Sequence, residues 1–124
     1  MSFFGRLHLL LIALALAAAG CGRTIDPDEQ LIGELKHVDL ETRRTAARYI
    51  SAMRPVPEKY IQPLMNALND NDPQVRQAAA EALGEIGIDG RPFVEQLNKT
   101  STEHFDPQVR FALQPAVQQI NSAQ

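Results

Sequence analysis

Side chains able to do covalent or metal chemistry are few in this sequence of 124 residues. Cys21 is the single cysteine, so no disulfide can form within the chain. His37 and His104 are the only histidines beyond residue 20, and neither has the second histidine four residues away that a zinc site on a helix would need. No glycine-rich phosphate loop and no serine in a strand-turn-helix elbow occurs. The sequence therefore predicts no catalytic residue, no metal site, no cofactor and no enzyme activity.

The first 20 residues have the composition of an export signal. Residues 1–6 carry one positive charge, and residues 7–20 form a mostly apolar run of about fourteen residues. A helix needs about 20 apolar residues to span a membrane, so this run predicts a removable signal peptide instead of a permanent anchor. The run ends in a series of small residues before the cysteine, which resembles the lipobox of bacterial lipoproteins: Ala18, Ala19, Gly20 and Cys21.

This resemblance implies cleavage after Gly20 and a diacylglyceryl group on the sulfur of Cys21. Ala18 stands where the lipobox usually has leucine, and the alternative is an ordinary signal cut near Ala19 that leaves Cys21 as a free thiol. Gly22 follows the cysteine in place of the aspartate that retains lipoproteins at the inner membrane, so an outer-membrane location is implied in a diderm organism. Residues 21–26 then form a short tether, because five residues after Cys21 span at most about 17 Å.

The charge of the remaining chain argues against a nucleic-acid partner. Removing residues 1–20 takes one positive charge, Arg6, from the 12 Lys and Arg and leaves all 15 Asp and Glu, so the net charge falls from -3 to about -4. Nucleic-acid-binding domains normally carry a basic surplus that neutralises phosphates. A chain of this size also predicts one small domain, not two.

An internal repeat organises the chain from residue 27 to residue 121. Apolar, aspartate and arginine positions of a first copy recur 33 residues later, and part of the pattern recurs after a further 34. The first and second copies share Leu31/Leu64, Leu35/Leu68, Asp39/Asp72, Arg43/Arg76, Ala46/Ala79, Ala47/Ala80 and Ile50/Leu83, and the third contains Asp106, Val109, Arg110 and Val117.

Each copy is predicted to be a pair of helices, because its apolar residues follow a three-four spacing. Aspartate precedes proline at 26–27, 72–73 and 106–107, a pattern typical of a helix start. The predicted repeats cover residues 27–54, 58–87 and 91–121. The third copy is about five residues longer between its two helices, and the polar stretch Asn98–Phe105 is expected to hold these residues in a lengthened turn.

The middle copy, Leu64 to Gly87, resembles the HEAT repeat superfamily, especially the short HEAT-like repeats of phycobilisome lyase subunits. The outer copies depart from that pattern at Leu40, where proline is usual, and at Pro115, which is expected to bend or loosen the last helix. The resemblance implies an all-α fold, a short α-solenoid of about three repeats, that ends within this chain.

The aspartate and arginine columns invite two interpretations. Asp70 and Asp72 could form an acidic cation site, but in the family the matching residues bridge adjacent repeats in a structural ladder. The ladder interpretation is the stronger one and covers Asp39, Arg43, Asp72, Arg76, Asp106 and Arg110. His37 and His104 are expected to lie at unrelated repeat positions as ordinary surface or packing residues.

One row of second-helix positions is predicted to face outward and to bind a partner. The row changes from basic to acidic to aromatic along the repeats: Arg44 and Arg48, then Gln77, Glu81 and Glu85, then Phe111. An aromatic ring on a polar face is a candidate anchor, although Phe111 could instead pack on Pro115 or under the inserted loop.

These features favour a lipid-anchored interaction or scaffold module of the cell envelope, with a protein partner that the sequence does not identify. Two alternatives remain open at this stage. The resemblance to lyase-type repeats also implies an enzyme or accessory factor acting on a tetrapyrrole chromophore. The third hypothesis is a small structural subunit of an envelope complex.

Overall fold

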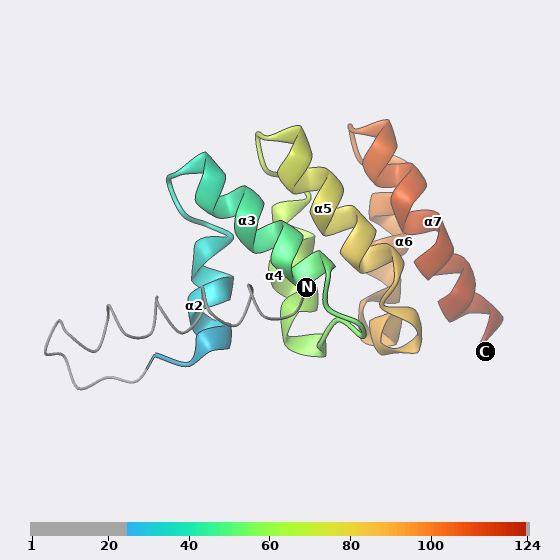
Figure 1. Ribbon diagram of the computed structural model, residues 1–124. Helices are drawn as coiled ribbons and strands as arrows, with labels where there is room; N and C mark the ends of the chain where they lie inside the picture. The colour runs from blue at the N-terminus through green and yellow to red at the C-terminus, as the bar shows by residue number, and fades with distance from the viewer. Residues whose placement is uncertain (1–24, 124) are drawn as a thin grey trace, which may run out of the picture. The chain divides into compact units, whose positions relative to one another are not determined.

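The computed structural model describes residues 25–123, and every regular element in this range is helical (Figure 1). This confirms the all-α fold predicted from the repeat. The α-helices are α2 (Pro27–Glu34), α3 (Leu40–Ser51), α4 (Ile61–Ala67), α5 (Pro73–Gly84), α6 (Val94–Glu103) and α7 (Pro107–Ser122). Two 3-10 helices, η1 (Glu58–Tyr60) and η2 (Gly87–Phe93), precede α4 and α6.

The chain divides into two compact units, residues 1–31 and residues 32–124. The described part of the first unit is the beginning of α2, where the Asp26 Oδ1 atom accepts a hydrogen bond of 2.9 Å from the backbone N–H of Asp28. The second unit contains α3 to α7. In it, α3, α5 and α7 lie side by side in one layer, with α4 and α6 behind them (Figure 1). Each second helix therefore packs on the second helix of the next repeat, as in stacked repeat proteins.

Aspartate residues begin the three second helices. The Asp39 carboxylate accepts a hydrogen bond from the backbone N–H of Thr42, that of Asp72 from Val75 and that of Asp106 from Gln108. In α5 and α7 a proline follows at the first helical position, where its missing N–H leaves no bond unmade. The cap residues thus fix where each helix of the front layer starts.

The core lies between the two layers and consists of the apolar residues with three-four spacing. On α5 the side chains of Val75, Ala79 and Leu83 are fully buried. Removing a side chain of leucine size from water stabilises a fold by about 2 kcal/mol. Gly84 allows α5 to pack closely against α7, because a Cβ atom added at this position would lie 2.5 Å from the carbonyl oxygen of Ala112 on α7.

The structure contradicts the predicted loop in the third repeat. Residues 98–103 belong to α6, so the extra residues lengthen a helix and not a turn. The hydroxyls of the polar stretch bond to carbonyls of their own helix: Thr100 to Gln96 at 2.8 Å, and Ser101 to Asn98 at 2.8 Å. Such back-bonding lets serine and threonine continue a helix that their composition alone would argue against.

Candidate functional site

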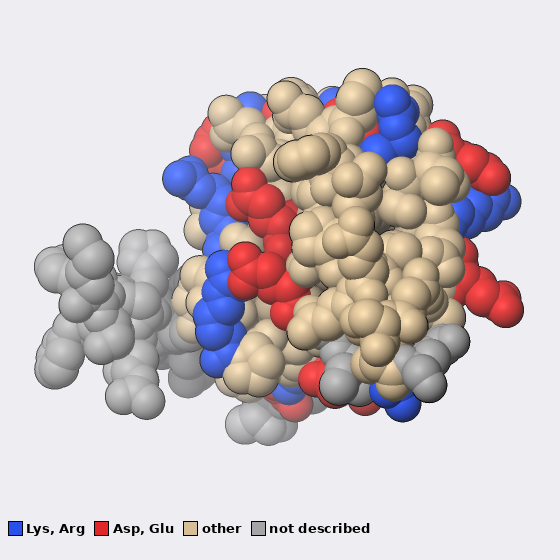
Figure 2. Space-filling view, turned by 90° about the vertical axis from the view of Figure 1, so that its right-hand side faces the viewer, with Lys and Arg blue, Asp and Glu red and all other residues tan. Residues whose placement is uncertain are grey.

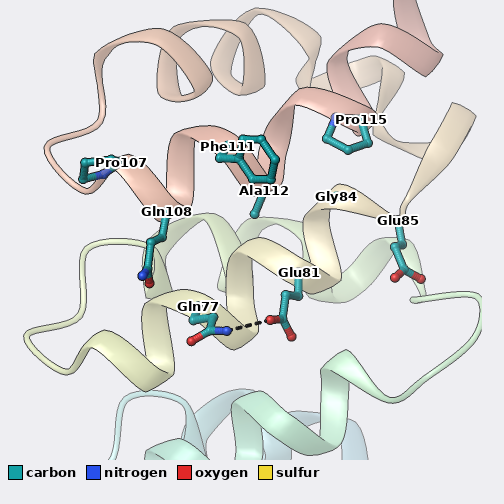
Figure 3. A pocket seen from close by; sticks show the side chains of 9 residues that line it. All are labelled: Gln77, Glu81, Gly84, Glu85, Pro107, Gln108, Phe111, Ala112 and Pro115. Carbon is teal, nitrogen blue, oxygen red and sulfur yellow. Dashed lines mark hydrogen bonds between the residues drawn. The ribbon is translucent and has the colours of Figure 1, made fainter.

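A groove of about 710 Å³ runs between α5 and α7 (Figure 3). Its two walls come from helix positions four residues apart, and its floor from two small residues, Gly84 and Ala112. The wall on α5 consists of Gln77, Glu81 and Glu85, and the wall on α7 of Pro107, Phe111 and Pro115, with Gln108 beside them. Four of the six residues predicted to bind a partner line this groove, namely Gln77, Glu81, Glu85 and Phe111, whereas the two of the first repeat, Arg44 and Arg48, do not.

The α5 wall is rich in hydrogen-bond acceptors. The amide nitrogen of Gln77 donates to Glu81 Oε1 at 2.9 Å, the bond drawn in Figure 3. Glu81 itself is exposed and forms no ion pair with any residue of the range 25–123. Glu85 forms an ion pair with Arg54, and both side chains are about half exposed. The carboxylate of Glu81 is therefore the charge of this wall that is free to meet a cation.

The α7 wall is apolar and exposed. The Phe111 ring lies between Pro107 and Pro115, and 76% of the residue is accessible to solvent. It is therefore not covered by Pro115 or by a loop, which was the alternative left open by the sequence. α7 continues as one helix through Pro115. Because proline has no N–H, the carbonyl of Phe111 lacks its usual helical donor four residues on.

Arg44 has a different role from the one predicted. Its guanidinium donates to both carboxylate oxygens of Asp72, at 2.8 and 3.0 Å, and also to Glu41 at 2.8 Å. The hydrogen bonds that Arg44 donates to the Asp72 carboxylate lower the pKa of Asp72 from 3.8 to about 2, and the same bonds raise the pKa of Arg44. Arg44 thus joins α3 to the start of α5 and is not available to a partner. Arg48 is exposed and lies outside the groove.

The predicted ladder residues lie on the loop side of the stack. Arg76 Nε donates to Asp106 Oδ2 at 2.9 Å, which joins the second repeat to the third and lowers the pKa of Asp106. Arg43 Nε donates at 2.8 Å to Asp70, not to the cap residue Asp72. The end members make bonds within their own repeat: Asp39 with Thr42, and Arg110 with the carbonyl of His104.

Asp70 and Asp72, considered above as a cation site, are therefore each bound to an arginine of the preceding repeat. A carboxylate engaged in this way has few lone pairs left for a metal. Among residues 25–123, no group of three or more histidine, cysteine, aspartate or glutamate side chains is arranged to hold a metal ion.

The prediction that His37 and His104 lie at unrelated positions is wrong. Both precede a cap aspartate by two residues, and Asp70 occupies the same position in the middle repeat. At all three, a ring nitrogen or carboxylate oxygen accepts from the backbone N–H of the cap residue, at 2.9 to 3.1 Å. His104 is also buried, and its Nε2 atom donates to the Leu68 carbonyl at 2.8 Å, because Nδ1 already acts as an acceptor.

The predicted signal and lipidation residues, Ala18, Ala19, Gly20 and Cys21, lie outside the described residues. Within residues 25–123, the structure contains no helix long and apolar enough to cross a membrane.

Comparison with known families agrees with the geometry. A family model described as HEAT repeats matches residues 29–118, which is most of the chain and nearly all of its helical part. No curated protein matches the chain. The resemblance of residues 27–121 to HEAT repeats, inferred from the sequence, is thereby confirmed over residues 29–118.

Proposed function

The chain belongs to the HEAT repeat family, and from this premise we propose that it is a lipid-anchored protein-binding module that docks its partner in the groove between α5 and α7. HEAT repeats generally mediate protein-protein interactions, and proteins built from them are typically scaffolds and not enzymes. A rigid stack suits this work, because a preformed surface loses little conformational entropy when it binds.

The exposed Phe111 ring in the groove is the observation that carries the proposal. Exposed aromatic residues beside a concavity are enriched at binding sites, and they often contribute most of the binding free energy. Pro107 and Pro115 flank the ring on the same wall of the groove, so the apolar surface extends to both sides of it. The ladder residues serve a different purpose, because their side chains are occupied in joining the repeats.

The anchor on Cys21 is supported by the sequence features of residues 1–21 and by the short interval before α2 begins at Pro27. Five residues reach at most about 17 Å, so the repeats would work close to the bilayer. Such tethering raises the effective concentration of a membrane-associated partner, which allows a small groove to act with modest intrinsic affinity.

The anchor and the docking site are tested separately. The intact mass of the protein purified from membranes should show a chain that starts at Cys21 and carries acyl groups. An unmodified thiol, or an amino terminus near Ala19, would remove the anchor from the proposal.

For the docking site, the full chain is purified from native membranes with its partners, as wild type, as Phe111→Ser and as Gln114→Ser. Gln114 is exposed on the same helix but does not line the groove. We expect Phe111→Ser to lose the co-purifying protein and Gln114→Ser to retain it. Equal recovery with all three proteins would mean that the groove is not the docking site.

A further inference from the structure

The chemistry of the groove restricts what can fill it. Its α7 wall is apolar, with one aromatic ring and two prolines, whereas its α5 wall presents the Glu81 carboxylate. No Lys or Arg lines the groove, and Glu81 is the carboxylate of its lining that is not already in an ion pair. A matching partner must bring donors to one side and apolar side chains to the other.

The charged residues around the groove also favour a partner with a cationic side and an apolar side. Seen from the α7 side, Asp and Glu side chains lie between a broad surface without charged residues and a column of Lys and Arg (Figure 2). The α7 helix contributes to the uncharged surface, because Arg110 is its only charged residue and its guanidinium is bound to the His104 carbonyl. Glu81 is thus a negative charge next to an apolar wall.

These observations exclude other classes of ligand. A nucleic acid or an anionic lipid head group would meet the carboxylate of Glu81 and no free cation among the residues that line the groove. A small uncharged ligand would leave the Glu81 carboxylate without a counterion, with only its hydrogen bond from Gln77. A cationic and apolar segment of a protein satisfies both walls.

The dimensions of the groove set the length of this segment. Pro107 and Pro115 are eight residues apart on α7, about 12 Å at 1.5 Å per residue. That distance corresponds to about two turns of a docked helix. Gly84 and Ala112 line the groove between its two walls, and α5 and α7 pack closely there.

We propose that the groove between α5 and α7 binds a short amphipathic helix that places a lysine or arginine against Glu81 and apolar side chains against Phe111. This inference rests on the proposed function and adds the chemical class of the partner to it. Binding of this kind is a helix-in-groove interaction, in which positions three and four residues apart supply the contacts.

The test uses three labelled helical peptides of about 16 residues, each differing in one row of side chains. The first carries a row of leucines beside a row of lysines, the second has glutamates in place of the lysines, and the third has serines in place of the leucines. Binding to the full chain in a non-ionic detergent is followed by fluorescence anisotropy. The variants are Glu81→Lys, Phe111→Ser and, as a matched control, Glu95→Lys, which makes the same charge change on the exposed surface of α6.

We expect the lysine peptide to bind best, and the serine peptide to bind at least about tenfold more weakly because it lacks the apolar contact. Glu81→Lys should weaken the binding of the lysine peptide about fivefold and strengthen that of the glutamate peptide, since an attraction between opposite charges becomes a repulsion. Glu95→Lys should change neither. Higher salt should reduce the effect of Glu81→Lys.

The contrary outcomes separate this inference from the proposed function. If binding depends on Phe111 but the lysine and glutamate peptides bind equally, the cationic partner is wrong and the docking site stands. If Phe111→Ser leaves the binding of every peptide unchanged, the docking site itself is wrong. If sedimentation shows that the chain alone dimerises, and that Phe111→Ser abolishes the dimer, the occupant is a second copy and the inference is overturned.

Discussion

Replacing Asp72 with asparagine tests how much of the stability depends on the ion pair between the first two repeats. Asp72 caps α5 and accepts two hydrogen bonds from Arg44. Asparagine caps a helix about as well as aspartate, so the substitution removes the charge and keeps the cap. The variant therefore isolates the contribution of the ion pair to the free energy of unfolding.

The size of the effect follows from the pKa of Asp72. The drop from 3.8 to about 2 corresponds to roughly 2 kcal/mol at most. The Arg44 side chain is 25% exposed, so solvent screens the pair, and we expect a loss of about 1 kcal/mol at pH 7. Because the folded-state pKa is the lower one, this contribution is fully present above about pH 5. It is lost as pH falls through 3.8 towards 2, with about half remaining at pH 3.

The assay is urea unfolding of the full chain at several pH values between 7 and 3, followed by helical circular dichroism. The difference in unfolding free energy between wild type and Asp72→Asn should shrink steadily below pH 5. Glu95→Gln, which removes an exposed carboxylate, should differ from wild type by less than about 0.5 kcal/mol throughout. A difference between wild type and Asp72→Asn that stays constant from pH 7 to pH 3 would refute the assignment of the stabilisation to the ionised carboxylate.

Three further substitutions, with His37→Ala as a control for one of them, test the packing of α5 and α7, the buried histidine and the open groove. Gly84→Ala should destabilise the chain by about 2 kcal/mol in urea unfolding, because its new methyl group meets the Ala112 carbonyl; a gain of stability, as helix propensity alone would give, would contradict this contact. His104→Ala should cost about 2 to 3 kcal/mol in the same assay, since it leaves the buried Leu68 carbonyl and the Asp106 N–H without partners. The equivalent His37→Ala, at an exposed site, should cost less than about 1 kcal/mol, and equal losses for the two variants would show that burial is not the cause. Gln77→Arg should place a guanidinium where Arg44 lies in the first repeat, so that it reaches towards Asp106 across the groove and weakens the binding of the lysine peptide about fivefold, while stability stays within about 1 kcal/mol of wild type; unchanged peptide affinity would indicate that this wall does not contact the peptide.

Much of the fold was predictable because each copy of the repeat contains the same pattern of buried apolar residues and helix-capping residues. Apolar side chains at three-four spacing and aspartate before proline define both the buried face and the start of each second helix. The extended α6 was not predictable from composition, because its serine and threonine hydroxyls are satisfied by carbonyls of the same helix. A polar stretch of this kind looks like a turn unless those local bonds are considered.

The site was predicted in part, and its errors share one cause. Helical phase placed Gln77, Glu81, Glu85 and Phe111 on one surface, where they line the groove together. The helical periodicity of one helix shows which side chains share a face, but not which residues of the next repeat lie close to them. It therefore did not reveal the hydrogen bonds between Arg44 and Asp72. His37, Asp70 and His104 occupy equivalent repeat positions, which the 33- and 34-residue offsets already imply. The equivalence was missed because histidine and aspartate are different residue types, although the side chain of each can accept a hydrogen bond from the cap residue.

The residue type at one repeat position explains why the described groove lies between α5 and α7. Arg44, Gln77 and Phe111 occupy equivalent places in the three repeats. In the first, the arginine reaches across to Asp72 and bridges α3 to α5. In the second, Gln77 carries no charge, so the equivalent cap Asp106 is bound by Arg76 from the loop side instead, and the surface between α5 and α7 stays open. In the third, no further helix follows α7 within the described residues, and the position carries an exposed phenylalanine. Substitution at one repeat position thus converts a contact that holds the stack together into a surface that a partner can use.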